Sequence, residues 1–302
     1  FEDGMVDTER YVLTAQAKEE YLSQFIPRRR KNKTASETGL RRSKDIKGKN
    51  LFYNSTVLKQ INQLKSLLSH EGLKDVQARL TECGLRRGIA CLFYGAPGTG
   101  KTESVLQLAR MTGRDVMQIN IAGLRDKYVG ESEKNIKAIF DRYRHICKSC
   151  EHTPILLFNE ADAIINSRFE TTSSSVEKMD NAMQNIILQE LENLDGILIA
   201  TTNLTGLIDT AFDRRFLFKV EFTKPDRDTR NSIWHSMLPD ISDADCRTLA
   251  EDFDFSGGQI ENIARKSKID YVISGQKPSI DRLKEFCNEE RVNRTTHTKI
   301  GF

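Results

Sequence analysis

The feature that most constrains this chain is a glycine-rich octapeptide, Gly95-Ala96-Pro97-Gly98-Thr99-Gly100-Lys101-Thr102. The apolar run at 89–94 before it predicts a strand covered on both faces, and residues 103–111 after it predict a helix. Glycines at this junction let the backbone turn its N–H groups toward an anion, and the helix N-terminus adds a favourable dipole. The octapeptide fits G-x-x-x-x-G-K-[ST], and in this setting it predicts a cradle for nucleotide phosphates.

The chemistry of the octapeptide assigns a task to its last two residues. Lys101 is expected to reach the β- and γ-phosphates, and the Thr102 hydroxyl to ligate Mg²⁺. ATP and Mg²⁺ are therefore the expected cofactors, and a glycine turn with an incidental lysine is the disfavoured alternative. The expected cofactor-binding residues are Gly95, Ala96, Pro97, Gly98, Thr99, Gly100, Lys101, Thr102, Glu103 and Asn159.

Strand and helix patterns alternate through the middle of the chain. We expect strands near residues 89–94, 116–120, 155–158, 197–200 and 218–222, with helices between them, notably at 133–146 and 180–194. This alternation predicts an α/β fold in which a five-stranded parallel sheet is covered by helices on both faces. Beyond Pro225 only helical patterns remain, at 230–237, 259–272 and 280–289.

Length and composition divide the chain into three parts. Its 302 residues exceed one ordinary domain, and 38% hydrophobic content supports a sizeable core. Residues 27–49 are basic and polar, which is typical of a linker. We expect an N-terminal helix and basic linker at 1–49, an α/β nucleotide-binding domain at 50–223 and a small helical lid domain at 224–302.

Charge, cysteine content and hydropathy narrow the expected partners and cellular compartment of the protein. A net charge of +3 is too small to argue for nucleic acid, and no run is long and apolar enough to cross a bilayer. The six cysteines resemble reduced thiols more than a disulfide framework, so a soluble, cytoplasmic protein without a membrane partner is expected. The chain begins with Phe1, which suggests a fragment of a longer chain.

A second polar cluster ends the apolar run at 155–158. Glu160 could orient a water molecule and accept its proton, which makes it the expected catalytic base. Asn159 stands where phosphate-loop ATPases carry an aspartate that positions the metal. Its amide oxygen can contact Mg²⁺ through a bound water, but it brings no negative charge, so metal affinity and turnover are expected to suffer.

Two further signals follow in the chain. A third strand pattern ends at Asn203, and two adjacent arginines, Arg214 and Arg215, come shortly after it. With the octapeptide and Glu160, these motifs stand in the order found in AAA+ ATPases. Over roughly residues 51–272 the chain resembles the AAA group of that superfamily, which includes protein-unfolding and complex-remodelling machines.

The resemblance implies further roles. Asn203 would be the sensor-1 residue, on a strand between those of the phosphate loop and Glu160, and would help to position water against the γ-phosphate. Arg214 and Arg215 would match the arginine-finger segment, which reaches the neighbouring subunit's nucleotide in a ring, typically a homo-hexamer. A salt-bridged surface pair is the alternative for the two arginines.

Two loops extend the resemblance. Tyr128, within Lys127-Tyr128-Val129-Gly130-Glu131-Ser132-Glu133, is similar to the pore loop that grips a threaded polypeptide; packing on its own domain is the alternative. Gln259 stands where many AAA+ relatives carry a phosphate-sensing arginine, so that arginine is expected to be absent. Adenine is expected near residues 51–54 and the lid helix.

Three functions follow, in order of preference. The first is a ring-forming ATPase that couples ATP hydrolysis to remodelling or threading of a protein substrate. The second is an ATP-dependent assembly switch or scaffold with weak hydrolysis, because Asn159 replaces the aspartate. The third, a nucleic-acid-acting AAA+ protein using the basic run, ranks last because Tyr128 suits polypeptide better. Zinc at His145, Cys147, Cys150 and His152 is disfavoured, since eight consecutive residues at a helix end form a compact site poorly.

Overall fold

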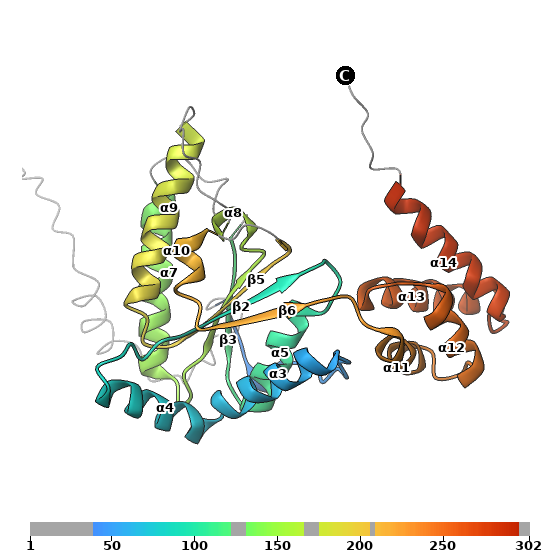
Figure 1. Cartoon of the computed structure of the whole chain (residues 1–302), viewed down its shortest axis with the longest axis horizontal. Coiled ribbons are helices and arrows are strands. Elements are labelled where there is room, and N and C mark those ends of the chain that lie inside the picture. Colours follow the sequence, from blue (N-terminus) through green and yellow to red (C-terminus); the bar gives the residue numbers. More distant parts are fainter. Residues whose placement is uncertain (1–38, 122–130, 166–174, 206–208, 296–302) are drawn as a thin grey trace, which may run out of the picture. The chain divides into compact units, whose positions relative to one another are not determined.

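The computed structural model describes residues 39–121, 131–165, 175–205 and 209–295, which belong to one compact unit beginning at Gly39 (Figure 1). The first half of its α/β region holds β1 (Leu40–Arg41), a 3-10 turn (Ser43–Asp45), α3 (Ser55–Leu67), α4 (His70–Glu82), β2 (Ile89–Gly95), α5 (Lys101–Thr112) and β3 (Val116–Asn120). The second half of the α/β region holds α7 (Glu131–Ser149), β4 (Ile155–Asn159), α8 (Asp162–Ile165), α9 (Ser175–Glu192), β5 (Ile197–Thr202), α10 (Thr210–Asp213) and β6 (Phe218–Phe222).

The strands form one sheet in the order β1-β3-β4-β5-β2-β6. Strands β2 to β6 pair in parallel, which confirms the α/β class and the five strands expected from the sequence. The sequence did not predict β1, which pairs antiparallel with β3 through Leu40 opposite Met117 and Arg41 opposite Val116. Two residues are too few to show a strand pattern, so the edge strand forms through its partner.

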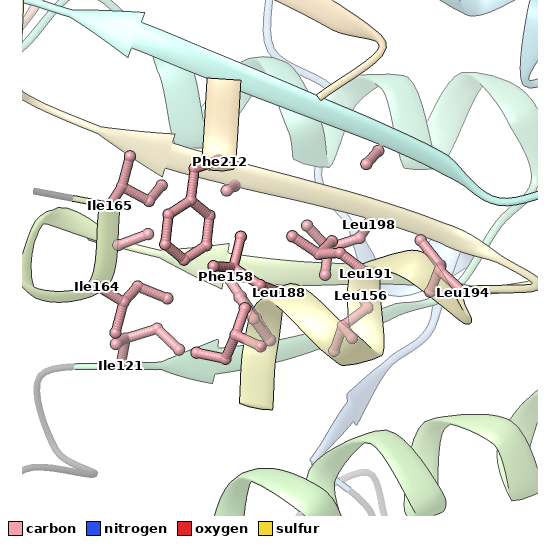
Figure 2. Packing of buried hydrophobic residues seen from close by; sticks show 14 of the residues in the cluster. Ile121, Leu156, Phe158, Ile164, Ile165, Leu188, Leu191, Leu194, Leu198 and Phe212 are labelled. Carbon is pink, nitrogen blue, oxygen red and sulfur yellow. The ribbon is translucent and has the colours of Figure 1, made fainter. Parts of the chain in front are cut away.

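The apolar side chains of each strand alternate between the two faces of the sheet, so helices pack on both faces. On one face, Leu92, Leu156 and Leu198 belong to a cluster with side chains from α7 and α9; Figure 2 shows Phe158 and Phe212 among these residues. On the other face, alternate residues such as Cys91 and Phe93 belong to a second cluster with α3 and α5. A nearly continuous apolar run such as 89–94 is what such a doubly covered strand needs.

Four helices follow the sheet: α11 (Arg227–Met237), α12 (Asp243–Asp252), α13 (Gly257–Ser274) and α14 (Ile280–Thr295). They have their own core around Trp234, Leu249 and Ile263. The sequence did not predict α12, although Ser242 caps it by accepting a hydrogen bond from the Asp245 N–H. No helix in the described ranges is long and apolar enough to span a membrane.

The end of the basic segment packs against the sheet domain. The Ser43 N–H donates to Asp115 at 2.8 Å, and the Gln107 side chain donates to the Lys47 carbonyl at 2.8 Å. Residues 39–49, assigned to a linker from their composition, are therefore held by the domain. The expected helix at 1–26 lies outside the described residues.

Candidate functional site

The phosphate loop joins β2 to α5 through three glycines with positive φ: 133° at Gly95, 76° at Gly98 and 91° at Gly100. At Gly95 a Cβ atom would lie 2.2 Å from the Phe222 carbonyl oxygen, so no other residue fits there. Gly100 is the N-cap of α5 and has no side chain to bond the first N–H groups of that helix. Those groups are therefore available to an anion.

Lys101 lies at the start of α5, and only 7% of it is exposed. Its Nζ donates to the carbonyls of Gly95 and Ala96, each at 2.8 Å, and to Asn203 Oδ1 at 2.9 Å. Burial lowers the pKa of Lys101 to about 8, while the nearby Asp162 carboxylate raises it. The ammonium group is thus held at the loop, next to the residue expected to be sensor 1.

Thr102 and Asn159 come together at the end of β4. The Thr102 hydroxyl donates to Asn159 Oδ1 at 2.7 Å, and the Thr201 hydroxyl donates to the same oxygen at 3.2 Å. Hydroxyl and amide oxygens are of the hard type that Mg²⁺ prefers, so the donor atoms fit that ion. The set carries no negative charge of its own.

Glu160 has the only positive φ of a non-glycine residue in the described part of the chain, 55°. Its N–H donates to Thr201 Oγ1 at 3.3 Å, and the next N–H, of Ala161, donates to the Thr201 carbonyl at 2.8 Å. Strained backbone of this kind clusters at functional sites. It turns the chain sharply after β4 and leaves Glu160 exposed.

Asn203 follows the end of β5, which lies between β2 and β4 in the sheet. Its side chain accepts from Lys101, and its backbone N–H donates to Asp162 Oδ1 at 2.9 Å. The Thr202 hydroxyl makes a short hydrogen bond to the same carboxylate oxygen. Sequence reasoning gave Asp162 no role. Its place in the sequence could have marked it as a site residue, because this carboxylate stands only two positions after Glu160.

The two arginines differ in their surroundings. Arg215 is held within the chain: it forms a close ion pair with Glu192 and donates to the Ala211 carbonyl at 2.7 Å. Arg214 is exposed, and within the described residues no ion pair or side-chain hydrogen bond involves it. Within the described part of the chain, Arg214 is thus the one of the two whose side chain is not held by a hydrogen bond or ion pair.

A cavity of about 450 Å³ lies beside the phosphate loop. It includes residues 51–54, near which the sequence predicts the adenine of ATP to bind. It is lined by residues 49–54, Gly98, Phe222 and the start of α13. Lys49 Nζ lies 3.6 Å from Glu103 and 3.8 Å from Glu261 at the wall of this cavity. The C-terminal helices thus supply part of the wall, as a lid would.

Gln259 is used within its own helix. In a capping box, Gln259 Oε1 accepts from the Ser256 N–H at 3.1 Å, while Ser256 Oγ accepts from the Gln259 N–H at 3.4 Å. The residue is buried and occupied by this role. Gln259 thus serves the start of α13 rather than the phosphate loop in this structure.

Other expected features fall elsewhere. Tyr128 and its loop lie outside the described residues, as does the basic run at 28–38. Cys147 and Cys150 are free thiols, and no group of three or more histidine, cysteine or acidic residues suited to a metal is found in the described ranges. His152 instead packs edge-to-face against His70, with ring centroids 4.5 Å apart and an interplanar angle of 60°.

The sheet order, the glycine loop and the lysine define a phosphate-loop nucleotide-binding protein with a helical lid. Residues 91–224 match the family model described as "ATPase family associated with various cellular activities (AAA)". The chain therefore carries an AAA ATPase-family domain.

Curated relatives agree with that family. A proteasome-associated ATPase of Thermobifida fusca is 35% identical over 178 residues, 52% of this chain and 30% of the relative. Protein CdcH of Halobacterium salinarum is 31% identical over 64% of this chain and 26% of its own length. A proteasome-associated ATPase of Streptosporangium roseum is 31% identical over 70% of this chain and 38% of the relative. The chain thus spans well under half the length of these relatives.

Proposed function

We propose that this chain binds and hydrolyses ATP with Mg²⁺, and that it couples hydrolysis to the remodelling or threading of a protein substrate. The observation that carries this is the convergence of three elements at one edge of the sheet. Lys101 from α5 contacts Asn203 after β5, and Thr102 contacts Asn159 at the end of β4. The names of the relatives support a protein substrate.

The residues would act as follows. The loop N–H groups and Lys101 bind the phosphates and hold the γ-phosphate beside Asn203. Glu160 orients the attacking water and takes its proton. Thr102, and Asn159 through a water, would hold Mg²⁺, which neutralises phosphate charge when bound. Residues 224–302 act as a lid whose angle changes with the nucleotide, and residues 50–223 form the catalytic domain.

Catalysis in this proposal needs a second copy of the chain. Arg214 is the better candidate for a finger, because Arg215 is already paired with Glu192. A guanidinium from a neighbour would stabilise the charge that spreads over the phosphoryl oxygens. We infer a homo-oligomeric ring, a hexamer by resemblance, located in the cytoplasm, with Tyr128 gripping the substrate polypeptide.

Phosphate release measured across a series of protein concentrations tests the proposal. Specific activity should depend on Mg²⁺, rise with protein concentration and disappear in Glu160→Gln, which should still bind ATP. Activity that is present but independent of concentration would contradict the ring. No activity at any concentration, with ATP binding intact, would contradict hydrolysis.

A second candidate function is an ATP-dependent assembly switch or scaffold. The specific observation in its favour is Asn159, whose neutral amide oxygen accepts from Thr102 where a carboxylate would assist the metal. In that case ATP would drive assembly while turnover stayed near zero. Nucleic acid is the least favoured target; binding by the basic segment would weaken steeply with salt.

A further inference from the structure

Asp162 has no part in the mechanism above, yet it joins the two strand ends that form the site. It is the first residue of α8, two positions after Glu160. Its Oδ1 atom accepts two hydrogen bonds from the end of β5: the Asn203 N–H at 2.9 Å and the short bond from the Thr202 hydroxyl. One carboxylate thus connects the chain after β4 to the chain after β5.

These bonds fix the backbone that carries Asn203. The strand ends at Thr202, so the Asn203 N–H lies beyond the regular ladder. Thr202 is buried, and besides donating to Asp162 it accepts from the Leu204 N–H at 3.1 Å. Two successive backbone N–H groups are therefore satisfied by this small network. On the other side, the Asn203 side chain meets Lys101 at 2.9 Å.

The network limits where the Asn203 amide can point. Its backbone N–H is directed at Asp162 while its Oδ1 is directed at Lys101 Nζ. Without the carboxylate, the Asn203 N–H would turn to water and the Thr202 hydroxyl would lose its acceptor. The side-chain amide of Asn203 would then no longer be held in one orientation toward the γ-phosphate position, and catalysis is sensitive to such misplacement.

We propose that Asp162 is a positioning residue for the reaction at this site: it holds the Thr202–Asn203 turn so that the Asn203 side chain faces Lys101 and the γ-phosphate. This inference rests on the proposed hydrolysis of ATP. It assigns Asp162 to orientation rather than to contact with the nucleotide, so it predicts an effect on turnover that passes through Asn203.

Two variants separate hydrogen bonding from the mere presence of a side chain. Asp162→Ala removes the acceptor, whereas Asp162→Asn keeps an oxygen for both donors. We expect Asp162→Ala to lower kcat about 10- to 100-fold with KM for ATP changed by less than about threefold, and Asp162→Asn to retain most of the activity. Ser242→Ala, which removes the cap of α12 away from the site, controls for general loss of stability.

A double-variant cycle tests the route through Asn203. If Asp162 acts by orienting that residue, adding Asp162→Ala to Asn203→Ala should lower kcat no further. Full multiplication of the two losses would overturn the proposal. The proposal would also be overturned if Asp162→Ala raised only KM for ATP, or if its kcat equalled that of Ser242→Ala.

Hydrogen exchange distinguishes failure of this inference from failure of the proposed function. Exchange at the Asn203 and Leu204 amides should speed up in Asp162→Ala and stay near the wild-type rate in Asp162→Asn, whether or not the chain hydrolyses ATP. Unchanged exchange in Asp162→Ala would overturn the positioning role. Absence of turnover in the wild-type chain, with the expected exchange pattern, would overturn hydrolysis only.

Discussion

The backbone N–H of Gly258 donates a hydrogen bond to the carbonyl of Gly98 at 2.8 Å. The second residue of the lid helix α13 thereby touches the phosphate loop itself. The approach is close enough that a Cβ atom on Gly98 would lie 2.7 Å from Ser256 Oγ. This pair therefore joins the start of α13 directly to the phosphate loop.

The contact predicts an unequal effect of two glycine substitutions. Gly98 and Gly84 have similar φ values, 76° and 68°, so alanine at either position incurs about 1 kcal/mol of backbone strain. Only at Gly98 does the added Cβ meet another group, since nothing lies within 4 Å at Gly84. Denaturant unfolding without nucleotide should show Gly98→Ala losing at least about 1 kcal/mol more than Gly84→Ala. Equal losses of unfolding free energy would mean that α13 does not stay in contact with the phosphate loop when the protein is in solution.

The pKa of Lys101 predicts how ATP binding depends on pH. Burial lowers this pKa to about 8, and only the charged form attracts phosphate. Affinity should therefore be steady below pH 8 and fall as pH rises above it, by up to about tenfold per unit. Titrations of ATP between pH 7 and 9.5 check this. Lys101→Arg, whose guanidinium stays charged, should bind more weakly but with a flatter profile, and an equally steep profile would contradict the assignment.

Restoring a carboxylate at position 159 should strengthen metal handling. Asn159→Asp places a negative charge 2.7 Å from the Thr102 hydroxyl, where an amide now stands. We expect the Mg²⁺ concentration for half-maximal phosphate release to fall and turnover to rise about tenfold. Asn193→Asp, on an exposed residue elsewhere, serves as a control for added charge. Unchanged metal dependence would show that Asn159 already suffices.

The different surroundings of Arg214 and Arg215 predict different defects. Arg214→Ala should lower turnover about 10³-fold and leave stability unchanged. Arg215→Ala breaks the pair with Glu192 and should cost about 1–2 kcal/mol of unfolding free energy, as measured by denaturant titration.

Mixing inactive variants tests where the finger acts. A Glu160→Gln subunit still carries Arg214, and an Arg214→Ala subunit still carries Glu160. If fingers act on the neighbouring subunit, equal mixtures should recover part of the activity that neither variant shows alone. Mixtures that remain inactive, although the subunits exchange, would contradict an arginine supplied by a neighbour.

Local patterns were enough to predict the five parallel strands and the phosphate loop, because a doubly covered strand needs an apolar run such as 89–94 and the spacing of the glycines and Lys101 is visible in the sequence. The edge strand β1 and the close approach of Phe222 to Gly95 were not predicted. The Arg215–Glu192 pair and the bonds of Asp162 could not be predicted, since they join residues brought together only by folding. The capping role of Gln259 was readable, because Ser256 stands three positions before it in the pattern of a capping box. The roles assigned to Glu160, Asn203 and Arg214 stay predictions.

The short strand β1 gives the chain a defined point of mechanical attachment. Whatever pulls on residues before Gly39 must act first on the pairing of Leu40 and Arg41 with β3, the outermost contact of the sheet. So short a pairing should yield under low force, long before β2 and β5 separate. The load would then pass to the hydrogen bonds that Ser43 and Lys47 form with Asp115 and Gln107. Only after these bonds break should tension reach Lys49 and the cavity wall.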